Sequence, residues 1–169
     1  DGALAGSLVK TSGGLLTLSG NNGYTGATSV DAGTLTLALG GSLTSATLGV
    51  SAGATLNAQT GSVLSGATVL TANGLVNLFN SAVTLETLLG SGTVVLDSTA
   101  LTLSSGSFSG VLNDGALAGS LVKTSGGLLT LSGNNGYTGA TSVDAGTLTL
   151  ALGGSLTSAT LGVSAGATL

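Results

Sequence analysis

The sequence predicts an all-β fold, a right-handed three-sided parallel β-helix, or β-solenoid. Three observations lead to this fold class. Glycine fills 31 of the 169 positions and proline is absent, so tight corners are frequent and no strand lacks a backbone donor. Short runs of Leu, Val and Thr alternate with Ser, Thr and Asn, which is the two-residue period of a β-strand. The sequence also repeats itself at two lengths, as solenoids do.

The longer repeat spans 113 residues. Residues 1–56 recur without a change as residues 114–169. The chain therefore holds one complete repeat, residues 1–113, followed by the first half of an identical repeat, residues 114–169. No linker composition separates the two, so we expect one continuous solenoid.

The shorter repeat is marked by glycines that precede apolar alternating segments, at spacings of 17 to 21 residues: Gly14, Gly33, Gly53, Gly74, Gly92, Gly110 and Gly127. These spacings predict about six coils of ~19 residues in each repeat and about nine coils in all, each with three short strands and three corners. A helical solenoid is excluded, because Gly and Ser interrupt every stretch long enough for a helix.

Strand-like segments follow these glycines in order. Residues 34–37 follow Gly33, residues 75–78 follow Gly74 and residues 93–96 follow Gly92. The Gly110 coil is the least clear, because its stronger strand signal, residues 100–103, comes earlier. We expect these side chains to point inward in columns: Leu16, Leu18, Leu35, Leu37, Val76, Leu78, Val94 and Leu96. The residues expected to point outward are Thr17, Thr34, Thr36 and Asn77.

Composition excludes several kinds of partner. Charged residues make up 5% of the chain, the net charge is −4, and the basic residues are Lys10 and its copy Lys123. Without a basic patch, nucleic acid and anionic membrane surfaces are poor partners. No apolar run approaches the ~18 residues of a membrane-spanning helix, so we expect no membrane insertion by this segment.

The residues that carry enzyme chemistry are missing. The chain has no His, Arg or Cys, so Ser and Thr have no partner base and thiolate metal sites cannot form. The acids are isolated and are expected to be solvated: Asp1, Asp31, Glu86, Asp97, and the copies Asp114 and Asp144. A paired-carboxylate site and an ice-binding Thr face are weaker alternatives. We expect no catalytic, cofactor-binding or metal-binding residue, no cofactor, and no enzyme activity.

The few aromatic residues and lysines have structural interpretations. Tyr24 and its copy Tyr137 are expected to cover a corner with the hydroxyl in water, and the alternative is an exposed ring that stacks on a sugar. Phe79 and Phe108 are expected to fill corners or the core. Lys10 is expected to cap a strand end or to pair with a nearby acid.

One stretch of about 30 residues carries a resemblance. Residues 8–35 read LVKTSGGLLTLSGNNGYTGATSVDAGTL and return at residues 121–148. This stretch resembles the passenger-associated transport repeat of autotransporter passenger domains, in which Lys-Thr-Gly-x-Gly-x-Leu-x-Leu-x-Gly leads to Asn-x-Tyr-x-Gly-x-Thr and then Val-x-x-Gly-x-Leu. Ser12 and Gly23 depart from that pattern. The resemblance implies a parallel β-helix at the outer-membrane surface of a Gram-negative bacterium or outside the cell, with roles in adhesion, autoaggregation or biofilm formation.

The sequence therefore leads to one functional hypothesis and one alternative. The hypothesis is a non-catalytic repeat segment of a bacterial cell-surface or secreted fibrous adhesin, acting as a stalk and in self-association. The alternative is a structural subunit of an extracellular filament, sheath or surface layer. The expected partners are neighbouring identical repeats of the same chain; lateral copies of the protein and host or matrix glycans are further candidates.

Overall fold

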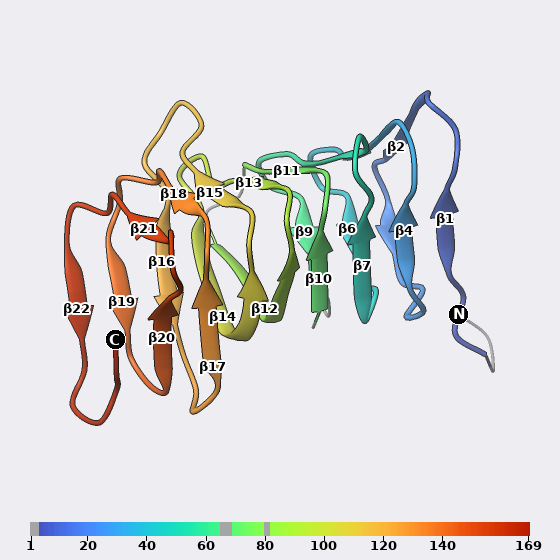
Figure 1. The fold of residues 1–169 in the computed structure, drawn as a ribbon. Coiled ribbons are helices and arrows are strands. Elements are labelled where there is room, and N and C mark those ends of the chain that lie inside the picture. The colour runs from blue at the N-terminus through green and yellow to red at the C-terminus, as the bar shows by residue number, and fades with distance from the viewer. Residues whose placement is uncertain (1–3, 65–68, 80–81) are drawn as a thin grey trace.

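The computed structural model describes residues 4–64, 69–79 and 82–169, and within these ranges the chain forms strands and turns without a helix. The strands are short and every pairing between them is parallel. Each strand lies beside a strand from the previous turn of the chain (Figure 1). The predicted parallel β-solenoid is confirmed, with about eight turns instead of about nine. Its right-handed winding and three-sided cross-section stay predictions.

Three ladders, each a run of hydrogen-bonded parallel strands, begin at the N-terminal side. The first ladder consists of β1 (Leu8–Lys10), β4 (Thr28–Val30), β7 (Thr47–Val50) and β10 (Val69–Ala72). The second ladder consists of β2 (Leu15–Leu18), β5 (Thr34–Leu37), β8 (Thr55–Ala58), β11 (Leu75–Leu78), β13 (Thr93–Val95) and β15 (Val111–Asn113). The third ladder consists of β3 (Asn21–Asn22), β6 (Ser42–Leu43) and β9 (Val63–Leu64).

Two long strands, β12 (Ala82–Gly90) and β14 (Ala100–Phe108), connect the two repeats. Their second halves extend the first ladder, because β10 pairs with the second half of β12, which in turn pairs with the second half of β14. The first half of β14 leads to β16 (Ser120–Lys123), β19 (Thr141–Val143) and β22 (Leu161–Val163). The second half of β14 leads to β17 (Leu128–Leu131) and β20 (Thr147–Leu150). The remaining pair consists of β18 (Asn134–Asn135) and β21 (Ser155–Leu156).

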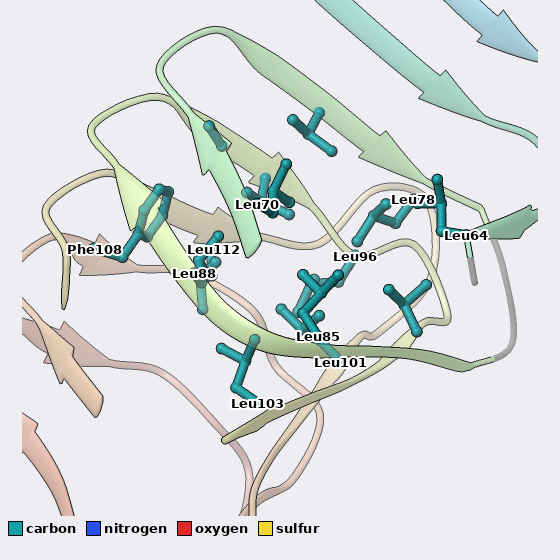
Figure 2. Close-up of a cluster of buried hydrophobic side chains, with 14 of the residues drawn as sticks. Leu64, Leu70, Leu78, Leu85, Leu88, Leu96, Leu101, Leu103, Phe108 and Leu112 are labelled. Atoms are coloured by element: carbon teal, nitrogen blue, oxygen red, sulfur yellow. The ribbon is translucent and has the colours of Figure 1, made fainter. Parts of the chain in front are cut away.

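The core is built from columns of aliphatic side chains stacked one coil above another. In the second ladder one fully buried column consists of Leu35, Leu56, Val76, Val94 and Leu112. Leu70, Leu88, Phe108 and other side chains fill the interior from other strands (Figure 2). Burying each such aliphatic side chain contributes about 1.5–3 kcal/mol.

Most predicted side-chain directions are confirmed. Leu35, Leu37, Val76, Leu78, Val94 and Leu96 are all buried. Leu16 and Leu18 are half-buried, because their coil has a neighbour on one side only within the described residues, whereas their copies Leu129 and Leu131 are fully buried.

One predicted outward position is wrong. Thr17 is exposed, and Thr34 and Asn77 are partly exposed. Thr36, in contrast, is only 8% exposed. It lies on the middle strand of three, between its paired residues Thr17 and Asn57, so neighbours on both sides shield it.

The predicted number of about six coils in a repeat is close to the structure, which has slightly fewer than six. Six turns carry the chain from Leu8 to Leu129, eight residues beyond Leu121, which is the copy of Leu8. One repeat therefore ends before six turns are complete, and the part that is missing is the step from one ladder to the next. As a result β17, the copy of β2, lies on the first ladder and not on the second (Figure 1).

A column of close-packed glycines shows the same shift. A Cβ atom on Gly92 would lie 2.1 Å from the Gly74 carbonyl oxygen, and one on Gly110 would lie 2.0 Å from that of Gly92. The column continues to Gly133, whose Cβ would lie 1.8 Å from the Gly110 oxygen, and not to Gly127 as the spacing predicted. Gly53 also falls one position out of line, because Ala54 occupies its place below Gly74.

Replacing Gly92 by alanine tests this backbone contact. The added methyl group would meet backbone atoms of Asn73 and Gly74, so coils must separate locally and the free energy of unfolding should fall by roughly 2–3 kcal/mol. Gly126→Ala is the matched control, because a Cβ there meets nothing within 4 Å. Urea unfolding followed by circular dichroism measures both variants. Equal stability of the two would contradict the close packing of the glycine column.

Candidate functional surface

Four polar side chains of the second repeat lie inside the solenoid: Lys123, Asn135, Tyr137 and Thr141. We call them the buried polar set. Their first-repeat copies, Lys10, Asn22, Tyr24 and Thr28, make similar contacts. Buried polar groups destabilise a fold unless they are hydrogen-bonded. Among the described residues, every buried side-chain nitrogen or oxygen has a partner.

Asn135 connects three successive coils. Its Oδ1 accepts a hydrogen bond from the Leu112 N–H (3.0 Å) on the preceding coil. Its Nδ2 donates to the Gly133 carbonyl (2.8 Å) and to the Ser155 carbonyl (3.0 Å) on the following coil. This role was not predicted from the sequence. The available signal was the pair of adjacent Asn residues, 21–22 and 134–135, directly after an apolar strand segment.

Lys123 holds a corner together. Its Nζ donates to the carbonyls of Thr124 (2.7 Å), Ser125 (2.8 Å) and Ala145 (3.1 Å), so it links its own corner to that of the next coil. Burial lowers the pKa of this lysine. The copy, Lys10, donates to the Ser12 and Ala32 carbonyls. The strand-end cap expected for Lys10 is confirmed; both lysines bind carbonyls and not an acid.

Tyr137 departs from its expected position. Its ring is fully buried and its hydroxyl lies 2.5 Å from the Thr141 hydroxyl, so the predicted water-exposed hydroxyl is wrong here. Burial, which the Thr141 hydrogen bond only partly offsets, raises the pKa of Tyr137 to about 12. Tyr24, in the first described coil, is half-buried and its pKa is raised for the same reason. The coil before each tyrosine decides its exposure, and neither ring is a free platform for a sugar.

The acids are scattered, with Glu86 inside β12 and the other described acids outside the strands. Asp31 and Asp144 are exposed and each accepts a hydrogen bond from a nearby serine, Ser29 or Ser142; Glu86 is exposed as well. Asp1 lies outside the described residues. Within the described ranges no three His, Cys, Asp or Glu side chains come together to hold a metal ion.

Two of the acids fix the loop between β15 and β16. Asp97 accepts from the Leu117 N–H (2.8 Å), and Asp114 accepts from the Gly119 N–H (2.7 Å) and from the N–H (2.8 Å) and hydroxyl (2.5 Å) of Thr138. Partial burial raises the pKa of Asp114, but its hydrogen bonds outweigh that effect and the pKa lies below its ordinary value. These carboxylates therefore act as acceptors that set the path of the chain.

The outer surface along the second ladder carries no charged side chain. In the second ladder the outward residues are Thr, Asn, Leu and Val, and Asn77 Nδ2 donates to Asn57 Oδ1 (2.7 Å) across two coils. Leu75 and Asn77 interrupt the row of threonines that an ice-binding face would need.

Beside this ladder lies a shallow hollow of about 700 Å³, lined by Leu39, Asn57, Gln59, Thr60 and Phe79. Phe79 thus lies at a corner, partly exposed, whereas Phe108 is a core residue, as expected for the two phenylalanines.

Comparison with protein families finds a match in two segments of the chain. The family model of the passenger-associated-transport-repeat matches residues 8–37 and 121–157. These two segments hold the buried polar set and its first-repeat copies. The comparisons with curated proteins and with solved structures give no significant match. In the part of the chain that the structure describes, no helix has the length and apolar character needed to cross a membrane.

Replacing Asn135 by alanine tests the buried polar set. The change leaves the buried Leu112 N–H and the Ser155 carbonyl without this partner, while the Gly133 carbonyl keeps its bond from the Ser155 N–H, so the free energy of unfolding should fall by about 2–4 kcal/mol. The adjacent Asn134→Ala is the matched control, because Asn134 is exposed and should change stability by no more than about 0.5 kcal/mol. Thermal unfolding measures both. A loss confined to Asn134→Ala would contradict the assignment.

Proposed function

We propose that this chain, whose two passenger-associated transport repeats and parallel β-solenoid fit an autotransporter passenger, is a non-catalytic stalk segment of a bacterial fibrous adhesin. A passenger repeat implies an extracellular or surface-exposed location. We further propose a Gram-negative outer membrane as the surface that carries it.

The continuity between the two repeats is the observation that carries the proposal. β14 of the first repeat pairs with both β16 and β17 of the second, so the ladders pass from one repeat into the next without a linker. In a solenoid, each added repeat buries its neighbour's open face and extends the same rod. Repetition of this unit thus lengthens a stalk instead of adding separate domains.

Self-association is the second part of the proposal. Apart from Glu86 in β12, the outward strand positions carry Thr, Ser, Asn, Val and Leu, and the exposed acids Asp31 and Asp144 lie outside the strands. Surfaces with so little like-charge repulsion favour side-by-side contact. Host or matrix glycans are the other proposed partner class, for which the amides and the Phe79 ring at the hollow offer hydrogen bonds and stacking.

Immunogold electron microscopy of intact producing cells, with an antibody raised against residues 1–113, tests the stalk. We expect gold particles along thin projections that are anchored singly in the cell surface. Labelling inside the cells only would contradict the surface location. Labelling of long polymers of uniform width, detached from cells, would favour the alternative, a structural subunit of an extracellular filament, sheath or surface layer.

A further inference from the structure

Identical strands of the two repeats lie on different ladders. β2 and β5 lie on the second ladder, which ends at β15. Their copies, β17 and β20, stack on the second half of β14, which belongs to the first ladder. β18, the copy of β3, takes the place after β15, where the Gly136 N–H donates to the Leu112 carbonyl (2.8 Å). In Figure 1, β15, β18 and β21 accordingly lie in the upper part of the solenoid and β17 and β20 in the lower part.

These strands carry an uncharged surface with prominent leucines, which we call the leucine–threonine patch. In the first repeat it consists of Leu15, Thr17, Thr34 and Leu39. In the second repeat it consists of Leu128, Thr130, Thr147, Thr149 and Leu152. Its four leucine side chains are between 54% and 104% exposed, and none of its residues is charged. Several exposed leucines on an uncharged face are typical of an interaction surface.

A second copy of this protein fits the patch best. Each copy has a net charge of −4, and the patch is a surface where two copies meet without carboxylates facing each other. The patch also recurs once in every 113 residues, so every repeat of an array offers a docking site and every repeat of another array of this protein offers the matching one.

We infer that the leucine–threonine patch is a docking surface for the same patch of another copy, and that successive repeats present it on different sides of the solenoid. This inference rests on the self-association in the proposed function. Three strands complete a turn, so a shift of one ladder per repeat returns the patch to the same side after three repeats, or about 82 Å at ~4.8 Å per turn. Arrays that dock in this way form branched bundles and not two-stranded ribbons.

The chain of residues 1–169 tests the inference because it carries the patch twice. Leu15→Glu/Leu39→Glu removes one patch, Leu128→Glu/Leu152→Glu removes the other, and the fourfold variant removes both. Sedimentation velocity should show assemblies larger than a dimer for the unmodified chain, dimers for either double variant and monomers for the fourfold variant. The matched control is Leu4→Glu/Leu117→Glu, which adds the same charge at two exposed leucines outside the patch and should behave as the unmodified chain.

Three outcomes would overturn the inference. Large assemblies of either double variant would mean that one patch, or another surface, is sufficient. Persistent assembly of the fourfold variant would assign association to the open strand edges at β1 and β22, which that variant retains. A monomeric unmodified chain would overturn the self-association part of the proposed function as well, but not the stalk, which the cell labelling tests separately. Circular dichroism confirms that each variant keeps its β-structure.

Discussion

Hydrogen bonding between successive coils is the interaction on which the whole structure depends. Strands of two to four residues cannot persist alone, and their backbone groups find partners only one turn earlier or later. The side chains follow the same rule, since Asn135 bonds to both neighbouring coils and Lys123 to the following one. The two identical segments, residues 1–56 and 114–169, show how much a side chain depends on its neighbouring coils. Leu129 and Tyr137 are buried below earlier coils, whereas their copies Leu16 and Tyr24 are only half-buried in the first coils described.

The local sequence pattern was sufficient to predict the fold, but not which ladder each strand of the second repeat joins. Alternation placed Leu35, Val76 and Val94 in the core, and glycine spacing aligned Gly74, Gly92 and Gly110, because two-residue periodicity and close backbone contact are local properties. The predicted continuation of the glycine column from Gly110 to Gly127 is wrong. Gly127 has the same sequence around it as Gly14. The loop before β16, held by Asp97 and Asp114, nevertheless lengthens the turn that follows Gly110, so Gly133 is the residue that stacks on Gly110. The length of a turn depends on contacts between coils, and the spacing of glycines in the sequence gives no information about these contacts.

The candidate site was predictable to a similar extent. The resemblance located the segment that the family model matches, and the strand-end role of Lys10 followed from its position. The burial of Tyr137 and the three-coil role of Asn135 did not follow, because both depend on which residues lie in the coil above and below. The scatter of the acids was simpler to predict, since isolated acids in a chain with two lysines have few charged partners. The result is a solenoid whose buried polar groups are structural and whose outer surface is weakly charged.

The shift of one ladder per repeat is the central structural claim, and cysteine cross-linking in a chain without native cysteines tests it most directly. Ser107 and Thr130 are paired neighbours in adjacent coils, within the Cα separation that a disulfide spans. Oxidation should therefore join Ser107→Cys/Thr130→Cys and leave Asn113→Cys/Thr130→Cys reduced, because Asn113 lies on the second ladder. Efficient joining of the Asn113→Cys/Thr130→Cys pair, with none at Ser107→Cys/Thr130→Cys, would restore a repeat of six whole turns and contradict the account.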